Sequence, residues 1–160
     1  MGKKIAYTGL AAAAALVLSY FERFIDLGIP GVKPGISNIA VLLVMYLFTT
    51  KAAFFVLVIK VVFGAIFGGN LSALLLSLSG GLLSFAGMVL CKRCRWFSVI
   101  GVSTAGGVLH NIGQLAAAAF VLHSGSVWYY LPFLLIAGIF AGVFTGAIAK
   151  GVIAAIDQRF

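Results

Sequence analysis

Long apolar stretches, separated by short groups of glycine, proline and charged residues, run through the whole chain. A helix needs roughly 20 apolar residues to cross a lipid bilayer. The pattern therefore predicts six membrane-spanning helices, near residues 5–21, 36–48, 52–67, 71–90, 97–122 and 128–149. The second stretch is short, so we expect it to begin within the preceding loop or to stop below the membrane surface.

The fifth apolar stretch is interrupted by a group of polar residues. Residues three and four apart share one face of a helix, so the spacing predicts a single stripe made of Gly106, His110, Gly113 and Gln114. Asn111 would lie about 100° to one side of this stripe. Polar side chains within a membrane usually face the bundle interior or a cavity. They either join neighbouring helices or form a binding site, and for the whole cluster we favour the binding site.

The composition explains why these stretches are interpreted as membrane spans. The chain of 160 residues is 63% hydrophobic and 9% charged, which is more apolar surface than a soluble domain of this size can bury. We therefore predict an all-α integral membrane protein with one bundle of six helices in a single domain.

Basic residues alternate between the two sides of this predicted bundle. Cytoplasmic loops of membrane proteins are enriched in Lys and Arg. With the N-terminus inside, the cytoplasmic segments hold eight of the 11 basic residues: Lys3, Lys4, Lys51, Lys92, Arg93, Arg95, Lys150 and Arg159. We therefore expect both termini in the cytoplasm. The net charge of +8 reflects this orientation, and it does not indicate nucleic-acid binding.

Lys60 lies inside the third predicted span. A lysine at that depth is costly unless its side chain reaches the membrane surface or meets an anion. We therefore consider two interpretations: the side chain extends to the cytoplasmic surface, or it binds a carboxylate or phosphate of a bound molecule.

The longest outer connection, residues 22–35, contains two prolines and three glycines. These residues exclude a regular helix, and a loop of this length often covers a ligand. We expect its acidic residues, Glu22 and Asp26, to be in solvent or to pair with Arg23 and Lys33.

Small residues mark two surfaces for close helix contact. Residues 11–15 are five consecutive alanines, which either pack within the chain or dock a separate membrane protein. Gly138, Gly142 and Gly146 repeat at four-residue spacing in the last span. This second pattern predicts a close helix pair and does not identify the partner helix.

Several kinds of chemistry are missing from the sequence. It has no G-x-x-x-x-G-K-[ST] loop for ATP hydrolysis. Its three acidic residues form no aspartate-rich cluster that could hold magnesium against a diphosphate. His110 and His123 have no partners at metal-ligand spacing, and Cys91 and Cys94 are interpreted as reduced thiols. We therefore predict that the chain is not an enzyme and carries no cofactor or metal.

Five motifs, taken in order, resemble one bacterial family. They lie at residues 30–38, 77–84, 98–103, 110–114 and 130–132. Together they resemble the Gx transporter family, also labelled heptaprenyl diphosphate synthase component I, from about residue 22 to residue 150. That family is similar to the S-components of energy-coupling-factor transporters, which capture vitamins and related molecules at the bacterial cell membrane.

The resemblance implies a function and a set of site residues. An S-component has six helices, borrows an ATPase through a membrane scaffold subunit and docks partly by small residues of its first helix, here Ala11 and Ala15. A ligand would enter from outside beneath residues 28–35 and contact Asn38, His110, Asn111 and Gln114, while Lys33 or Lys60 neutralises an anionic group. Vitamins, flavin-like molecules and quinone or isoprenoid precursors all fit this expectation.

Two other functions remain open. The chain could be a non-catalytic membrane subunit that assists heptaprenyl diphosphate or menaquinone biosynthesis. It could also be a gradient-driven transporter, which we disfavour because the sequence offers no carboxylate within a span as an ion relay.

Overall fold

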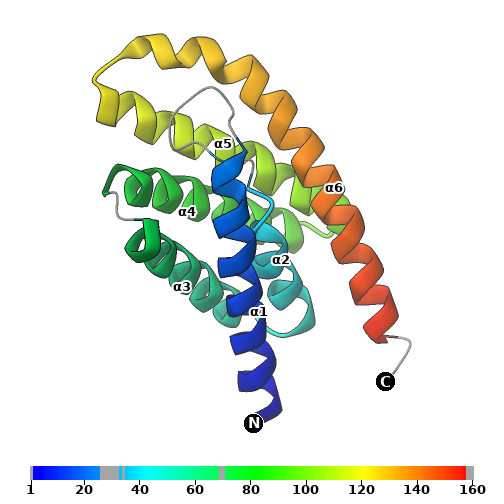
Figure 1. The fold of residues 1–160 in the computed structure, drawn as a ribbon. Helices are drawn as coiled ribbons and strands as arrows, with labels where there is room; N and C mark the ends of the chain where they lie inside the picture. The colour runs from blue at the N-terminus through cyan, green and yellow to red at the C-terminus, as the bar shows by residue number, and fades with distance from the viewer. Residues whose placement is uncertain (1, 26–32, 34, 69–70, 158–160) are drawn as a thin grey trace.

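The computed structural model describes residues 2–25, 33, 35–68 and 71–157, and within them the protein is entirely helical (Figure 1). Two short 3-10 helices, η1 (Glu22–Phe24) and η2 (Gly125–Tyr130), accompany the six α-helices. The α-helices are α1 (Gly2–Phe21), α2 (Asn38–Leu47), α3 (Thr50–Gly68), α4 (Leu71–Arg93), α5 (Val99–Leu122) and α6 (Leu131–Asp157). The all-α prediction is confirmed, and each helix overlaps the stretch from which it was predicted.

Four segments are long and apolar enough to cross a membrane: Thr50–Phe67, Leu71–Arg93, Val99–Leu122 and Gly125–Ile156. The apolar part of α1, Ile5–Phe21, is shorter. At 10 residues, α2 is about 15 Å long, roughly half of the hydrocarbon thickness of a bilayer. The protein is therefore a multi-pass membrane protein by helix length and composition, while six complete crossings remain a prediction.

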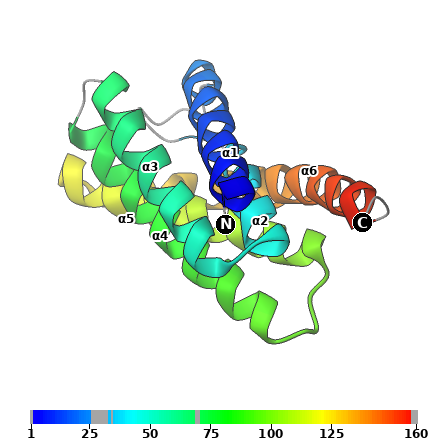
Figure 2. The same ribbon diagram turned by 90° about the horizontal axis from the view of Figure 1, so that it is seen from below.

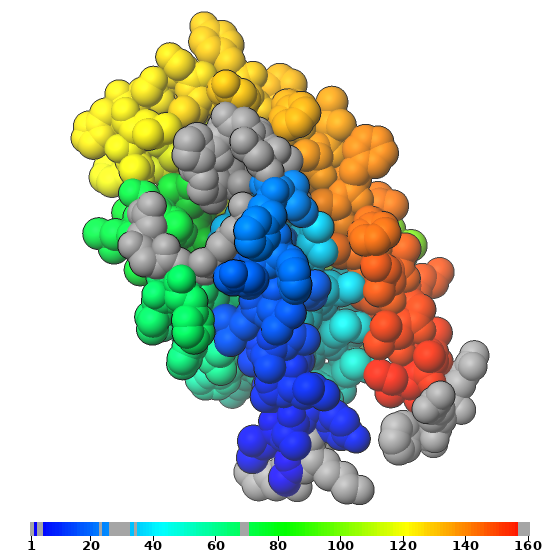
Figure 3. All heavy atoms as spheres, viewed as in Figure 1, coloured from blue at the N-terminus to red at the C-terminus, as the bar shows by residue number. Residues whose placement is uncertain are grey.

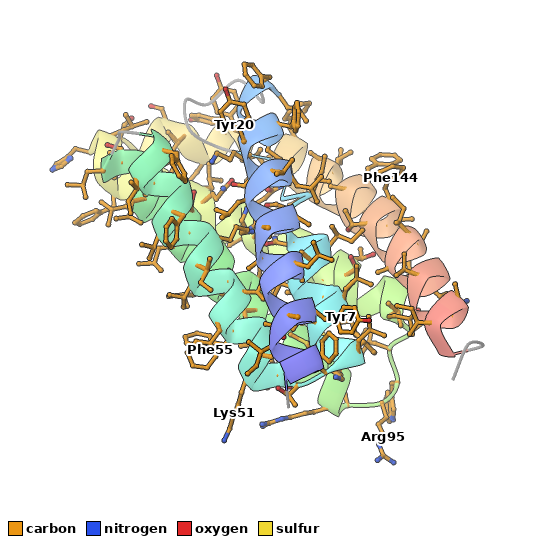
Figure 4. The ribbon with its side chains drawn as sticks, turned by 60° about the horizontal axis from the view of Figure 1, so that its bottom comes forward. Tyr7, Tyr20, Lys51, Phe55, Arg95 and Phe144 are labelled. Carbon is orange, nitrogen blue, oxygen red and sulfur yellow. The ribbon has the colours of Figure 1, made fainter. Side chains whose placement is uncertain are left out.

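Large apolar side chains cover the outside of the bundle. Phe55 on α3 and Phe144 on α6 point away from the other helices (Figure 4), and they are 64% and 60% exposed. Such side chains are costly in water and favourable in lipid. Their exposure on opposite sides of the bundle agrees with a surface that faces hydrocarbon.

Helix α5 lies between α4 and α6 and packs along both of them. A Cβ atom added to Gly107 of α5 would lie 2.4 Å from the carbonyl oxygen of Gly138 in α6. On the other side of α5, a Cβ on Gly113 would lie 2.8 Å from the Cα of Gly80 in α4. The predicted close contact of the glycines in α6 is confirmed, and its partner is α5 of the same chain.

Helix α1 lies across the bundle and packs against α2 and α3 (Figures 2 and 3). Ala12 and Ala15 face inward, and Ala15 is 0% exposed. Ala11 is half-buried, while Gly9 and Ala13 are exposed. Ala12 and Ala15 therefore pack within this chain, and Ala15 is not accessible to a partner in this structure. Docking through Ala11 remains a prediction.

The two ends of the chain lie at the same end of the bundle, at the bottom of Figure 1. Lys51 and Arg95 extend from that end (Figure 4). Nearby, Lys92 Nζ donates a hydrogen bond to the carbonyl oxygen of Met45 and lies 4.6 Å from the centre of the Tyr46 ring. This cation therefore stabilises the C-terminal end of α2. Lys51, Lys92 and Arg95 lie at this end as the sequence predicts, and the cytoplasmic side of that end remains a prediction.

Candidate functional site

The polar stripe of α5 lies on one face of the helix, as its spacing predicts, and that face meets α4. His110 and Gln114 are both buried. A Cβ on Gly80 of α4 would lie 2.6 Å from Gln114 Cγ and 3.1 Å from His110 Nδ1. Ser79 Oγ also donates a hydrogen bond of 2.7 Å to the Gly113 carbonyl oxygen. The missing side chain of Gly80 therefore makes the room that the two polar residues occupy.

Lys60 is buried in the middle of α3 and does not reach the membrane surface. Its Nζ donates hydrogen bonds of 2.6 Å to Asn38 Oδ1 and 3.1 Å to Ser37 Oγ. The interpretation in which Lys60 extends to the cytoplasmic surface is therefore wrong. The physical reason is that the first turn of α2 supplies acceptors closer than the water at the membrane surface.

Glu22, the first residue of η1 directly after α1, is 3% exposed. It accepts hydrogen bonds from Ser37 N at 2.9 Å and from Ser37 Oγ at 2.7 Å. The Ser37 side chain does not cap α2; instead its hydroxyl donates to Glu22 and accepts from Lys60. Glu22 and Lys60 thus form a buried charge pair joined by one hydroxyl group. The expectation that Glu22 lies in solvent is wrong. Asp26, for which the same was expected, is outside the described residues.

Gly35 brings the start of α2 directly against the ring of His110. Its φ is +81°, a conformation that residues with a Cβ rarely adopt. A Cβ there would also lie 2.8 Å from His110 Cδ2 and 3.2 Å from Asn38 Nδ2. A side chain at residue 35 would therefore separate Asn38 of α2 and Lys60 of α3 from His110 of α5.

The main chain of the outer loop reaches the same place. Lys33 N donates a hydrogen bond of 2.9 Å to Gln114 Oε1, although 81 residues separate the two in sequence. The structure therefore brings together Lys33, Asn38, Lys60, His110 and Gln114, five of the residues predicted for substrate binding, from one loop and three helices. The proposed cover formed by residues 28–35 lies mostly outside the described residues.

Asn111 does not join this cluster. It is 0% exposed and faces α6, where its Nδ2 donates a hydrogen bond of 2.7 Å to the carbonyl oxygen of Leu134. The offset of about 100° from His110 explains this direction. Asn111 therefore ties α5 to α6, which is the helix-joining role that was the alternative for each polar residue of the stripe.

Three buried polar atoms of the cluster have no hydrogen-bond partner in the described part of the chain: Asn38 Nδ2, His110 Nδ1 and Gln114 Nε2. Buried polar groups in folded proteins nearly always have partners. We call this cluster, made of Lys33, Asn38, Lys60, His110 and Gln114 with their neighbours, the α2–α5 site. It has unused hydrogen-bonding capacity in the interior of the bundle. The site also contains Glu22, Gly35 and Ser37, which sequence reasoning did not find. Glu22 could have been found because a lysine within a membrane span needs a negative charge nearby.

A family model described as heptaprenyl diphosphate synthase component I matches residues 11–152. The chain belongs to this family. The match confirms the resemblance seen in the sequence motifs, and it contains every residue of the α2–α5 site. No curated protein and no solved structure matches the chain.

One small cavity of this heptaprenyl diphosphate synthase component I family member adjoins the α2–α5 site. Its volume is about 10 Å³, close to the least that a single water molecule needs. Its lining comes from the start of α2 and from α4, α5 and α6: Gly35, Asn38, Met88, Ser103, Gly106, Gly107, Ala141, Gly142 and Thr145. A water there is a suitable partner for an otherwise unpaired polar atom.

A larger surface hollow lies at the other end of the family member's fifth helix. Its volume is about 530 Å³, and Gly125, Ser126, Trp128 and Tyr129 line it. None of the predicted site residues contributes to it. The described residues contain no group of three or more His, Cys, Asp or Glu side chains that could hold a metal ion, and both Cys91 and Cys94 carry free thiols.

Proposed function

We propose that this protein is the substrate-binding subunit of a transporter in the bacterial cell membrane. It captures a small vitamin-like molecule, or a precursor of an isoprenoid or quinone, and it depends on separate scaffold and ATPase subunits for energy. The observation that carries the proposal is the α2–α5 site, with its unpartnered polar atoms of Asn38, His110 and Gln114. The chain itself binds and performs no catalysis.

The energetics of these atoms support binding. Each buried donor or acceptor without a partner costs about 1–3 kcal/mol. Three of the five such atoms in the described residues lie around the same histidine, and the other two are Ser84 Oγ and Asn111 Oδ1, whereas some buried polar groups of the bundle are satisfied. Ser103 and Thr145, for example, pair with each other at 2.9 Å. A bound molecule that supplies the missing partners accounts for this concentration of unsatisfied groups.

The position of the site supports capture from the outer side. Gln114 accepts from the main chain of Lys33, which belongs to the connection between α1 and α2. Tyr20, near the end of α1 from which that connection starts, lies at the end of the bundle opposite Lys51 and Arg95 (Figure 4). If the basic end faces the cytoplasm, the connection that supplies Lys33 to the site begins on the outer side.

Two buried amides on α5 allow a matched experiment. Gln114 faces the site, whereas Asn111, three residues earlier, bonds to α6. Native protein and the variants His110→Ala, Gln114→Ala and Asn111→Ala are purified in mild detergent, and small molecules released from each are identified by mass spectrometry. Thr104→Val provides a second control because Thr104 bonds to the carbonyl oxygen of Ile100 in its own helix and not to the site.

We expect native protein, Asn111→Ala and Thr104→Val to retain one common compound, and His110→Ala and Gln114→Ala to lose it. Loss of one hydrogen bond weakens binding about tenfold, which is enough to remove the compound during washing. Circular dichroism establishes that each variant is folded. If all five samples carry only the same lipids, the α2–α5 site does not bind a specific ligand.

The family description supports a second candidate, a non-catalytic membrane subunit that assists a heptaprenyl diphosphate synthase. This function predicts that a soluble, acid-rich enzyme purifies together with the chain from its native membrane. The transporter function predicts a membrane scaffold and an ATPase instead. Purification of the tagged chain from its own cells and identification of the associated proteins separates the two candidates.

A further inference from the structure

The orientation of both amides in the α2–α5 site follows from their partners. Asn38 Oδ1 accepts from the ammonium group of Lys60, and Gln114 Oε1 accepts from the main-chain N–H of Lys33. Both of these partners can only donate. The atoms assigned as oxygens are therefore correct, and the two unpartnered atoms, Asn38 Nδ2 and Gln114 Nε2, are NH₂ groups that can only donate.

The charge of Lys60 is already matched by that of Glu22. The Lys60 ammonium and the Glu22 carboxylate are linked through the Ser37 hydroxyl, and both side chains are at most 5% exposed. Removal of one partner from a buried charge pair leaves an uncompensated charge, which is strongly unfavourable. An anionic ligand group that took Lys60 for itself would leave Glu22 in that state.

We infer that the α2–α5 site binds an uncharged group that carries hydrogen-bond acceptors, such as ring carbonyl oxygens, and not a carboxylate or a phosphate. This inference rests on the proposed binding function of the site and names the chemical class of its ligand. Two free NH₂ donors require acceptors, and a neutral acceptor leaves the pair of Glu22 and Lys60 intact. His110 Nδ1, also unpartnered, donates or accepts according to its tautomer.

Three probes that share one ring system test the inference. The first is 2,3-dimethyl-1,4-naphthoquinone, which is neutral and carries two carbonyl oxygens. The second, 2,3-dimethylnaphthalene, lacks the acceptors, and the third, 2-naphthoate, carries an anion. Binding of each to the full-length protein in detergent is measured by equilibrium dialysis against protein-free micelles, which corrects for partition into detergent.

We expect the quinone to bind native protein at one molecule per chain, the hydrocarbon to show no excess over empty micelles, and 2-naphthoate to bind at least tenfold more weakly than the quinone. Asn38→Asp and Gln114→Glu keep the accepting oxygens, replace the NH₂ donors by oxygen and add a negative charge, and both of the last two changes disfavour a ligand that offers acceptors. Each should weaken quinone binding at least tenfold.

The charge pair is tested separately. Glu22→Gln leaves Lys60 uncompensated, so this variant should bind 2-naphthoate at least tenfold more tightly than native protein does. Adding Lys60→Gln to it removes the remaining charge and should return 2-naphthoate binding to the native level. Because glutamine is close in size to both residues, these variants preserve the packing of α1, α2 and α3.

Three results would overturn the inference: 2-naphthoate binding native protein as tightly as the quinone, no gain for 2-naphthoate in Glu22→Gln, or no binding of any probe. If 2-naphthoate binds at least as tightly as the quinone and Gln114→Ala abolishes its binding, the binding function stands and only the ligand class is wrong. If no probe binds and native protein retains no compound of its own, the proposed function fails as well.

Discussion

The contact between α5 and α6 can be tested by adding one methyl group to Gly142. A Cβ there would lie 2.5 Å from the Cα of Thr104 and 2.8 Å from the carbonyl oxygen of Ser103. Ordinary contacts between carbon atoms are about 3.5–4.0 Å. The two helices must therefore separate locally by about 1 Å in Gly142→Ala.

Gly151 on the same helix provides the matched control, since a Cβ there meets nothing within 4 Å. Replacing glycine by alanine inside a helix stabilises the helix by about 1 kcal/mol. This stabilisation applies at both positions. Overpacking costs about 1–3 kcal/mol and applies only at Gly142. Because the obstacle is main chain, which cannot rotate away, we expect a difference of about 2–3 kcal/mol between the variants.

The measurement is equilibrium unfolding in mixed micelles with increasing sodium dodecyl sulfate, followed by far-ultraviolet circular dichroism. The free energy of unfolding of Gly142→Ala should fall about 2–3 kcal/mol below that of Gly151→Ala. Equal free energies for the two variants would refute the close approach of α5 and α6, and with it the placement of Asn111 on the α6 side.

Two further predictions concern α5 and its ends. Ser98 caps this helix by accepting from Gly101 N at 3.2 Å, so Ser98→Ala should lower the free energy of unfolding by about 1 kcal/mol in the same assay, and Ser98→Asp should restore it. Single cysteines at Arg95 and His123, in a chain without Cys91 and Cys94, test the orientation: a membrane-impermeant maleimide should label residue 123 in intact cells and residue 95 only after permeabilisation. The reverse pattern would contradict a cytoplasmic basic end.

Helix positions could be predicted from sequence because the signal is local. Apolar runs bounded by glycine, proline and charge mark each helix, and the spacing of His110 and Gln114 puts both on the face that meets α4. The same rule explains why Asn111 turns toward α6. These features depend only on the geometry of one helix.

The partners of Lys60 could not be predicted in the same way. Glu22 and Ser37 are 38 and 23 positions away in sequence, on other elements, and no periodicity links them to α3. Gly35 is similar: its role follows from the ring of His110 lying against it, which depends on how α2 meets α5. Sequence reasoning located the polar residues of the site, and tertiary packing decided which of them are neighbours.

The buried carboxylate of Glu22 removes one argument against a gradient-driven transporter, namely that the bundle offers no acidic relay. Its hydrogen bonds point to a different role. Both carboxylate oxygens accept from Ser37, one from the main chain and one from the hydroxyl. A relay group must exchange its proton with water, yet this carboxylate is 3% exposed and both of its oxygens are held by Ser37. Glu22 is therefore better suited to hold Lys60 and Asn38 in place than to carry protons.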